Sequence, residues 1–351
     1  MSTILFDAYW LFSGPPSGRN VLRSLVDAWI EDHPNDDVTL AVPMGQLSLA
    51  ETDHLKGRVR FIGVKGSPHG LSVMFRLDTR GYDLVFAQNF APRRRPGTRT
   101  AVFVHDVLYL RHPRWFTFAE RAYLRLSLWS LARADSILTS SQSEALHVRK
   151  AVPKASKKKV AAVGLGLSSA YQRAASRPPE GFDDSSEYFL TVGRLNIRKN
   201  VAFCASALLE HDVISPARPL VVVGAADGRP DRFSGLAAAI ADGSIVFESK
   251  VGDSELKWLY EHALVFVFPS LDEGFGLPIL EATDAGARMA LSDIPPFREL
   301  SRHGPFFDPS NARSVADAVA RALLQPPPEA SLADDLWRRT VVAARAISLA
   351  E

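Results

Sequence analysis

Two glutamates, Glu273 and Glu281, lie eight positions apart in the segment SLDEGFGLPILEA, which covers residues 270–282. The apolar run ALVFVFP comes directly before this segment, so the pattern predicts a buried strand, then a turn, then a helix. Gly274 and Gly276 let such a turn adopt a positive φ or approach a ligand closely. A helix that begins after the turn presents free N–H groups and a partial positive charge, which favour a bound phosphate.

Because carboxylates repel phosphate, we predict that Glu273 and Glu281 bind other parts of the same ligand. Ionised carboxylates accept hydrogen bonds, so the hydroxyl groups of sugars are suitable partners. A nucleoside diphosphate sugar carries a hydroxyl-bearing ring on each side of its diphosphate, and Glu281 would bind the ribose while Glu273 binds the transferred sugar. Pro278 suits the start of the helix. The alternative is a loop glutamate and a first-turn glutamate that the helix dipole stabilises without a ligand.

A second charged group follows the apolar run EYFLTV in the segment TVGRLNIRKN, residues 191–200. Arg194 and Lys199 lie five positions apart, just after Gly193, where a strand is predicted to end. Fixed cations at this point would stabilise a diphosphate that leaves with developing negative charge. Arginine can bind two oxygens at once, and lysine acts as a compact charge. The alternative is a solvated basic turn.

His105 and Asp106 end a further apolar run, RTAVFVHD. A histidine at the carboxyl end of a parallel strand could donate a hydrogen bond to a bound sugar. Asp106 could orient this histidine or help to activate an acceptor hydroxyl. The alternative for His105 is a purely structural role, which is the common one for a lone histidine.

The segment SGPPSGRN, residues 13–20, joins the first apolar run to an amphipathic stretch. It predicts a glycine-rich loop, with a helix that starts at about Gly18 and whose N-terminus could reach a phosphate. The segment is not a G-x-G-x-x-G fingerprint, which argues against a dinucleotide site and an NAD-linked dehydrogenase.

Apolar runs followed by amphipathic stretches recur along the chain, which predicts βαβ units with buried parallel strands. In the first half these runs are STILFDAY, DDVTLAVP, RVRFIGV, YDLVFAQ, RTAVFVHDV, DSILTSS and KVAAVGLG; in the second half they are EYFLTVGR, PLVVVGAA, SIVFESKV, ALVFVFPS and ARMALS. We therefore predict an α/β fold with two Rossmann-like, doubly wound domains that face each other across a cleft.

The length of 351 residues also favours two hydrophobic cores over one. The polar segment SRPPEGFDDSSE, residues 176–187, predicts an interdomain linker. The domain boundaries that follow are 1–175 for the N-terminal domain and 188–330 for the C-terminal domain. Residues 331–351 are expected to form a last helix that could pack back on the N-terminal domain.

Taken together and in this order, the motifs resemble those of the retaining GT-B glycosyltransferases of family 4. FVFPSLDEGFGLPILEA is similar to the E-x7-E signature of that family, and TVGRLNIRKN is similar to the GR…KN segment of its donor domain. VFVHDVLYLRHPRWF, DSILTSSQSEALHV, KKVAAVGLGLSSAYQ and PFFDPSN resemble further segments. The match covers about residues 1 to 320. The joint order of the motifs makes the resemblance specific, and no single motif does so.

The resemblance implies that the N-terminal domain binds the acceptor and the C-terminal domain binds the nucleotide-sugar donor. It implies catalytic roles for His105, Glu273, Arg194 and Lys199. The donor-binding positions that it implies are Gly18, Gly193, Arg194, Lys199, Gly274, Phe275, Gly276 and Glu281. No metal and no cofactor is expected, because the sequence contains no D-x-D motif and no cluster with metal-ligand spacing.

The function that the resemblance implies is retaining transfer of a hexose to a sugar or to a polyprenyl-diphosphate-linked glycan, in polysaccharide or lipopolysaccharide biosynthesis. The resemblance to bacterial polysaccharide enzymes, which includes the segment HPRWF, implies α-mannosyl transfer from GDP-mannose. The segment TDAGARMALS departs from the small-residue CG-x-P turn that is common in the family, and Ser249 stands where a glycine is usual. A UDP- or dTDP-sugar donor therefore stays open. A non-catalytic subunit that binds nucleotide sugars is the alternative from a different class.

The net charge of +2 divides unevenly between the two halves of the chain. Residues 1–175 hold 24 Lys and Arg against 14 Asp and Glu, a balance of +10, and the rest of the chain has a balance of −8. The basic runs RRR at 93–95 and KASKKK at 154–159 could therefore meet phospholipid or a lipid-linked acceptor. Solvated loops explain these runs equally well. No nucleic-acid partner is expected.

The sequence predicts a cytoplasmic location. It has no signal-peptide pattern and no apolar run of about 18 residues. Its single cysteine, Cys204, suits a reducing compartment, and Cys204 is expected in the core.

A group of aromatic residues follows HPR on an amphipathic stretch. We predict that these side chains pack in the core, and a lipid-facing surface is the alternative; the group comprises Trp115, Phe116, Phe118, Tyr123 and Trp129.

Overall fold

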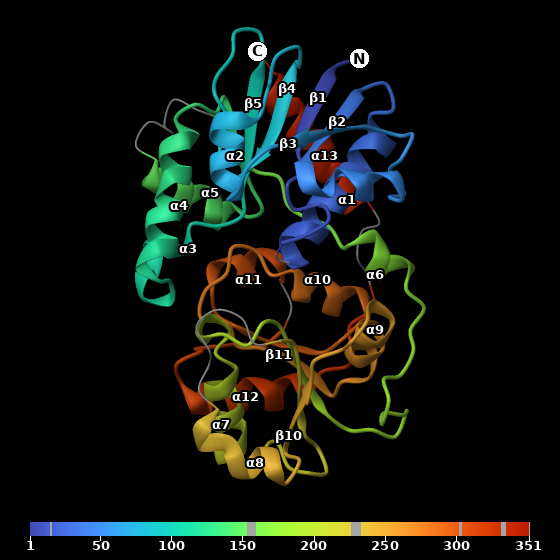
Figure 1. The fold of residues 1–351 in the computed structure, drawn as a ribbon. Coiled ribbons are helices and arrows are strands. Elements are labelled where there is room, and N and C mark those ends of the chain that lie inside the picture. Colours follow the sequence, from blue (N-terminus) through green and yellow to red (C-terminus); the bar gives the residue numbers. More distant parts are fainter. Residues whose placement is uncertain (15, 153–158, 226–232, 302–303, 331–334, 351) are drawn as a thin grey trace. The chain divides into compact units, whose positions relative to one another are not determined.

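The computed structural model describes residues 1–14, 16–152, 159–225, 233–301, 304–330 and 335–350. The chain forms two compact units. Unit 1 comprises Met1–Pro113, Thr117–Ser168 and Asp334–Glu351, and unit 2 comprises Arg114–Phe116 and Ser169–Ala333. Each unit is built on a parallel sheet with helices packed against it, as Figure 1 shows.

The sheet of unit 1 has the strand order β3-β2-β1-β4-β5-β6-β7 within the described residues, and all neighbours run parallel. The strands are β1 Thr3–Asp7, β2 Asp37–Pro43, β3 Arg60–Val64, β4 Leu84–Gln88, β5 Arg99–Val104, β6 Ser136–Thr139 and β7 Lys159–Ala162. Each lies in one of the seven predicted apolar runs, so the predicted strands are confirmed. The strand order reverses between β1 and β4, and such a switch point leaves room for a ligand at the carboxyl ends of the strands.

The helices of unit 1 cover both faces of this sheet. They are α1 Pro16–Asp32, η1 Met44–Glu51, α2 His69–Arg76, α3 Leu108–Arg111, α4 Phe118–Leu131, α5 Gln142–Ala151 and α13 Leu336–Leu349. The short helix η2, Pro113–Trp115, starts in unit 1 and continues into the segment Arg114–Phe116 of unit 2. Helix α1 begins two residues before the predicted start at Gly18. Gly18 thus lies in the first turn, where a Cβ would come within 3.0 Å of the Trp10 ring.

The prediction that the aromatic group packs in the core is wrong for Phe118 and Trp129 of helix α4. Phe118 is 78% exposed and Trp129 is 58% exposed, whereas the small residues Ser127 and Ser130 on the same helix are buried. Tyr123 is half-buried, and its hydroxyl accepts a hydrogen bond from Gly70 N at 2.7 Å. The helix therefore buries Ser127, Ser130 and Leu131 against the rest of unit 1 and leaves Phe118 and Trp129 in solvent.

The sheet of unit 2 has the order β10-β9-β8-β11-β12-β13 within the described residues, again parallel throughout. The strands are β8 Phe189–Val192, β9 Leu220–Val223, β10 Ile245–Glu248, β11 Val265–Phe268, β12 Met289–Ser292 and β13 Phe306–Phe307. Five of them lie in the predicted runs, and β13 is an additional two-residue edge strand. The two units therefore repeat one doubly wound topology, as predicted, and unit 2 has its switch point between β8 and β11.

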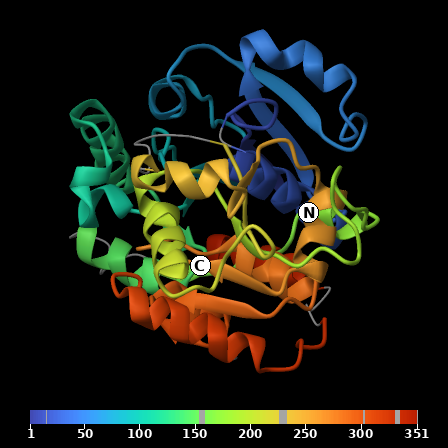
Figure 2. The same cartoon turned by 90° about the horizontal axis from the view of Figure 1, so that it is seen from below.

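The helices of unit 2 complete its core. They are α6 Ser169–Arg173, η4 Ile197–Lys199, α7 Val201–Glu210, η5 Ser234–Leu236, α8 Ala237–Ala241, α9 Asp253–His262, α10 Leu277–Asp284, α11 Pro295–Leu300 and α12 Ala312–Leu323. Helices α7 and α12 pack against each other, and α12 also contacts β11 and β12 (Figure 2). Cys204 of α7 is fully buried in this core, as predicted.

The compact units divide the chain at Ser168, before the polar segment 176–187 that suggested a linker. Residues 169–175, which the sequence assigned to the N-terminal domain, belong to unit 2. Helix α13 packs on α1 and belongs to unit 1. The chain thus returns to its first unit after it has completed the second.

A two-point ion pair anchors α13 to unit 1. Arg345 donates from Nε and Nη2 to the two oxygens of Asp36, at 2.8 and 3.0 Å. Asp36 also accepts hydrogen bonds from Ser2 N and from Trp29 Nε1. Burial alone would raise the pKa of Asp36, but the hydrogen bonds from Arg345 and Ser2 lower it overall. The last helix is therefore fixed by a carboxylate that is 2% exposed.

We expect Arg345→Met to destabilise unit 1 by about 2–3 kcal/mol at neutral pH, because it leaves a buried carboxylate without its cation. Since the pKa of Asp36 is lowered in the folded unit, this contribution is complete above the ordinary value of 3.8 and is lost as the pH falls below it. Urea unfolding followed by circular dichroism measures the loss. The matched change Arg338→Met removes a pair whose arginine is 72% exposed and should cost less than about 1 kcal/mol. Equal effects of the two changes would contradict the anchoring role.

Candidate functional site

Both charged loops of unit 2 lie at its switch point. The loop that carries Gly193 and Arg194 follows β8, and the loop that carries Glu273 follows β11, the strand beside β8 in the sheet. A backbone hydrogen bond from Leu271 N to Arg198 O, at 2.9 Å, joins the two loops directly. The predicted site residues of this unit are therefore brought together at the carboxyl edge of one sheet.

The carboxylate of Glu273 is the centre of this cluster. Its Oε1 atom lies 2.7 Å from Lys199 Nζ and accepts a hydrogen bond from Ser270 Oγ at 2.9 Å. Its Oε2 atom accepts a hydrogen bond from Arg198 Nη1 at 2.6 Å. The Lys199 ammonium also lies 4.5 Å from the centre of the Phe268 ring, a cation–π distance. One acidic group is thus held between two cations.

Glu273 and Lys199 are both nearly inaccessible to solvent, at 6% and 8% exposure. Burial alone would raise the pKa of Glu273, but the charges of Arg198 and Lys199 outweigh it and bring the pKa down to about 2. Burial lowers the pKa of Lys199, while Glu273 acts against this change. Glu273 is therefore an ionised, fixed hydrogen-bond acceptor at neutral pH.

Two glycines fit closely around this cluster. Gly193 has φ +147°, and a Cβ there would lie 3.0 Å from the Lys199 side chain. Any other residue would therefore strain the backbone and displace Lys199. Gly276 has φ +126° and caps the N-terminus of α10, where a Cβ would meet Phe297 at 3.0 Å. Phe275 between the glutamate loop and this cap is buried. Pro278 is the second residue of α10, one position after the predicted start.

Glu281, on α10, has a different environment from Glu273. Its Oε2 atom accepts a hydrogen bond from the Tyr260 hydroxyl at 3.0 Å, and its backbone oxygen accepts one from Tyr171 at 3.2 Å. Burial raises the pKa of Glu281 to about 7, although the hydrogen bond from Tyr260 lowers it. Glu281 therefore changes its protonation state near neutral pH, which Glu273 does not.

In unit 1, His105 follows β5 and lies beside the end of β4. Its Nε2 atom lies 2.8 Å from Gln88 Oε1, and the Gln88 amide nitrogen donates to Asp7 O at 3.3 Å. This orientation of Gln88 requires His105 to carry its proton on Nε2. Burial lowers the pKa of His105 to about 4, so the ring is neutral. In this tautomer the remaining ring nitrogen, Nδ1, is an acceptor, and the contact of His105 with a sugar stays a prediction.

A second histidine lies in the same part of unit 1. His69 Nε2 lies 2.7 Å from Asp7 Oδ2, and both side chains are buried. The Trp10 ring packs on His69 and on His105, with ring centres 4.7 and 5.8 Å apart. The Trp10 ring also lies against Gly18. The glycine-rich segment 13–20 therefore packs near the two histidines through the side chain of Trp10.

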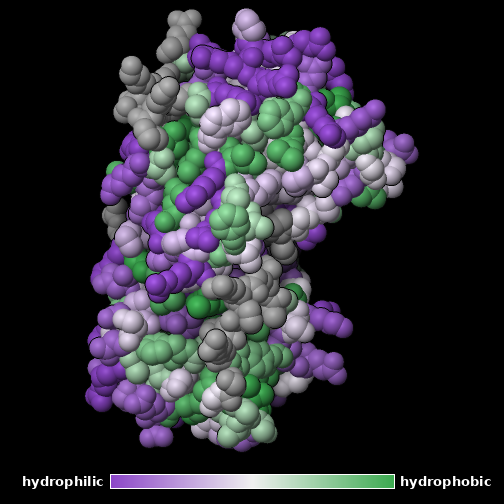
Figure 3. Space-filling view, turned by 60° about the vertical axis from the view of Figure 1, so that its left-hand side comes forward, coloured by the Kyte–Doolittle hydropathy of each residue, from purple (hydrophilic) through white to green (hydrophobic). Residues whose placement is uncertain are grey.

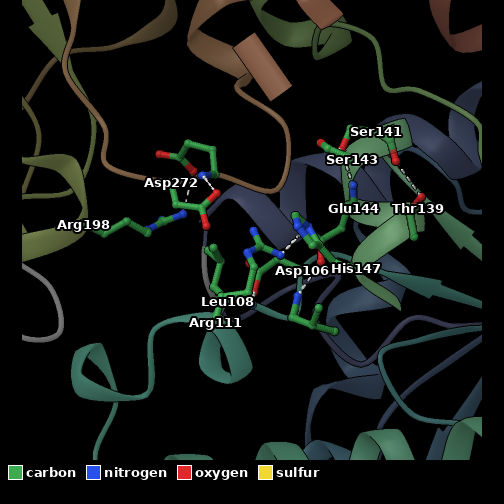
Figure 4. Close-up of polar contacts among 12 residues, drawn as sticks. Asp106, Leu108, Arg111, Thr139, Ser141, Ser143, Glu144, His147, Arg198 and Asp272 are labelled. Atoms are coloured by element: carbon green, nitrogen blue, oxygen red, sulfur yellow. Dashed lines mark hydrogen bonds and ion pairs between the residues drawn. The ribbon is translucent and has the colours of Figure 1, made fainter. Parts of the chain in front are cut away.

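The turn that follows His105 is held from α5. Buried Glu144 accepts hydrogen bonds from Val107 N at 2.7 Å and from Arg111 Nη1 at 3.0 Å, and Arg111 lies 2.7 Å from His147 Nδ1 (Figure 4). Asp106 accepts a hydrogen bond from Leu108 N, the first residue of α3, at 3.1 Å. This network fixes the backbone on which His105 lies.

The sequence predicted most of these residues but missed several partners. Arg198, Ser270 and Tyr260 hold the two glutamates. Gln88 holds His105 and is itself held by the backbone oxygen of Asp7. Arg198 stood next to the predicted Lys199, so its charge was visible in the sequence. Its contact with a residue 75 positions away was not.

The described residues contain neither a candidate metal centre nor a candidate membrane-spanning helix. No group of three or more His, Cys, Asp or Glu side chains there is placed to hold a metal ion. No helix in the same residues combines the length and the apolar character that crossing a membrane requires.

Comparison with known proteins defines the class of unit 2. Residues 172–335 match the family model of the glycosyl transferases group 1. This part of the chain is a glycosyltransferase group 1 domain, and it includes Arg194, Lys199, Glu273 and Glu281.

Two similar proteins are O-antigen enzymes. RfbU of Salmonella typhimurium, an O-antigen chain mannosyltransferase, is 29% identical over 224 residues, which are 62% of this chain and 59% of that protein. O-antigen chain mannosyltransferase B of Escherichia coli is 33% identical over 159 residues, 44% of this chain and 39% of that protein. The chain therefore spans less than two thirds of the length of these relatives.

Two solved structures show the fold. Sucrose-phosphate synthase from Thermosynechococcus elongatus has a TM-score of 0.67 at 17% identity, over 99% of this chain and 97% of that chain. Anabaena HepE in complex with UDP has a TM-score of 0.64 at 15% identity, over 99% and 96%. At these identities the likeness concerns the fold, which is that of GT-B glycosyltransferases with two Rossmann-like domains.

We expect Arg198→Met to raise the pKa of Glu273 and to destabilise unit 2 by about 3 kcal/mol at neutral pH, because a buried carboxylate loses one of its cations. In the wild type the lowered pKa gives a contribution that is complete above 4.5 and is lost as the pH falls towards 2. In the variant the loss should begin at the same pH, which the unfolded chain sets, but it should be smaller and should be complete at a higher pH than in the wild type. Thermal unfolding between pH 3 and pH 7 measures the shift.

The control for this experiment is Arg298→Met, which removes an exposed ion pair with Asp293 in the same unit and should leave the unfolding profile unchanged. The change Arg198→Lys keeps the charge and should restore part of the stability. An Arg198→Met profile that coincides with that of the wild type over the whole pH range would show that Lys199 alone keeps Glu273 ionised.

Proposed function

We propose that the protein is a retaining glycosyltransferase that moves a hexose from a nucleoside diphosphate sugar to a sugar or a lipid-linked glycan. The observation that carries this proposal is the ionised Glu273 between Arg198 and Lys199, at the switch point of a glycosyltransferase group 1 domain. Such a cluster offers a fixed acceptor for sugar hydroxyls beside fixed cations for a diphosphate.

In this proposal unit 2 binds the donor. The diphosphate lies on the N–H groups of the turn at Gly274, Phe275 and Gly276, with Arg194 and Lys199 as its cations. Glu273 accepts hydrogen bonds from the transferred sugar, and Glu281 accepts them from the ribose. Lys199 can turn to the diphosphate without leaving Glu273 unpaired, because Arg198 remains on the other carboxylate oxygen.

The reaction replaces one bond at the anomeric carbon by another. The bond from this carbon to the diphosphate oxygen breaks, and a bond to the acceptor hydroxyl oxygen forms on the same face. The hydroxyl proton passes to an oxygen of the leaving diphosphate, so no enzyme base is consumed. Arg194 and Lys199 stabilise the charge that develops on the diphosphate. Unit 1 binds the acceptor, and neutral His105 accepts a hydrogen bond from a sugar hydroxyl through Nδ1.

Mannose is the sugar that we propose, with GDP-mannose as the donor. The support comes from the similar O-antigen mannosyltransferases of Salmonella typhimurium and Escherichia coli. A UDP-sugar is the second candidate, because the structurally similar HepE is described with UDP and with UDP-glucose. The proposed acceptor is a sugar or a polyprenyl-diphosphate-linked glycan, with peripheral contact between unit 1 and a membrane.

We expect Lys199→Ala and Arg194→Ala to reduce transfer by at least about a hundredfold, because each removes a cation that stabilises the leaving diphosphate. The matched control, Lys250→Ala, removes an exposed lysine of the same unit and should keep wild-type turnover. Release of nucleoside diphosphate in the presence of acceptor glycans measures transfer, after a thermal-shift panel of GDP-, UDP-, dTDP- and ADP-sugars has identified the donor. Wild-type turnover in both variants would refute the assignment. A wild-type protein that binds the donor tightly but transfers no sugar would favour a non-catalytic subunit.

We expect the affinity for the donor to rise about tenfold between pH 6 and pH 8, because the pKa of Glu281 is about 7 and its ionised form binds the ribose hydroxyls better. Calorimetry at the two pH values measures the change. In Glu281→Gln the affinity should be low and nearly independent of pH. A wild-type affinity that is constant over this range would remove Glu281 from the ribose site.

A further inference from the structure

Helix α4 presents its large apolar side chains outward. Phe118, Leu126 and Trp129 are 78%, 37% and 58% exposed. Positions 118, 122, 126 and 129 recur at intervals of three and four, so they lie along one face of the helix. The buried face of the same helix carries Ser127, Ser130 and Leu131. Two of the three buried side chains of α4 are thus serines, while two large aromatic side chains face solvent, although aromatic residues of a surface helix ordinarily face the core.

Helix α2 extends this apolar face. Leu71 and Phe75, one helical turn apart, are 38% and 46% exposed. The guanidinium of Arg133 lies 5.9 Å from the Phe75 ring centre and 4.4 Å from that of Trp129, so it connects the two helices. Figure 3 brings the α2–α4 side of unit 1 forward and shows hydrophobic side chains among hydrophilic ones on it.

Arginines surround these apolar side chains. Arg93 lies 5.7 Å from the Phe75 ring centre, and Arg121 lies 5.9 Å from that of Phe118. Arg125 is exposed on α4 between Phe118 and Trp129. Glu120, an acidic residue of this helix, is held by Thr117 in the capping box at the N-terminus. We call the whole set the α2–α4 surface; it comprises Leu71, Phe75, Arg93, Phe118, Arg121, Arg125, Leu126, Trp129 and Arg133.

We propose that the α2–α4 surface docks unit 1 on an anionic lipid bilayer. Aromatic side chains partition into the interface between lipid headgroups and acyl chains, and arginines beside them bind the lipid phosphates. Phe118 and Trp129 are separated by about 16 Å along α4, so both can enter the interface when the helix lies flat on it. Charge complementarity selects the occupant, because the arginines lie around the apolar side chains and match a layer of phosphates.

The proposal makes the suggested peripheral membrane contact specific to one surface. Contact with the membrane was predicted for the basic runs 93–95 and 154–159. We now assign it to the α2–α4 surface. Of those runs, 93–95 supplies Arg93, and 154–158 lie outside the described residues. The inference rests on the proposed membrane contact of unit 1 and not on sugar transfer, so the two can fail separately.

Vesicle sedimentation of the full chain tests the proposal. We expect the wild type to sediment with vesicles of phosphatidylglycerol and phosphatidylcholine, to bind less at high salt, and to bind weakly to phosphatidylcholine alone. The double change Phe118→Ser and Trp129→Ser should lower the partition coefficient by about tenfold or more, because two apolar side chains no longer enter the interface. The double change Arg121→Gln and Arg125→Gln should remove the preference for anionic vesicles.

The matched control is Met44→Ser with Leu49→Ser, which removes two apolar side chains of unit 1 that are 46% and 47% exposed and lie on η1. This control should bind vesicles like the wild type, and circular dichroism should show that all variants are folded. Vesicle binding that is absent in the wild type, or unchanged in the Phe118 and Trp129 variant, would overturn the proposal. A wild-type dimer that this variant converts to a monomer, without vesicle binding, would assign the surface to a second copy of the chain.

Discussion

The arrangement of unit 2 depends on one buried carboxylate and its two cations. Glu273 would be a costly charge in a site that is 6% exposed if Arg198 and Lys199 did not compensate it. The loop after β8 supplies both cations, and the loop after β11 supplies the acid. These ion pairs therefore hold the loop after β8 and the loop after β11 in fixed positions relative to each other. Gly193 is part of the same constraint, because a side chain there would displace Lys199.

The second glutamate differs from the first because its partner differs. Glu281 receives one hydrogen bond from an uncharged phenol, so burial dominates and its pKa rises to about 7. Glu273 receives two cations and its pKa falls to about 2. Two acids in one motif thus have separate properties, a permanent anion beside the cations and a titrating group on α10. Unit 1 adds a neutral histidine whose proton is fixed by Gln88.

The sequence predicted the strands and the switch-point residues because buried parallel strands read as continuous apolar runs and the charged residues follow them directly. It did not predict the role of Arg198, since the partner is 75 positions away and the contact arises only when β8 and β11 pair. It also misplaced Phe118 and Trp129. A helical pattern of apolar residues predicts an inward face, and only the packing of α4, which buries Ser127, Ser130 and Leu131, shows that Phe118 and Trp129 face solvent.

The most direct test of this account is a crystal structure with the sugar nucleotide that stabilises the protein most. The account predicts that the diphosphate lies on the backbone N–H groups of residues 274–276, within reach of Arg194 and Lys199. Glu273 should contact the transferred sugar while it keeps its bond to Arg198, and Glu281 should contact the ribose. A diphosphate bound elsewhere, or a sugar that touches neither glutamate, would contradict it.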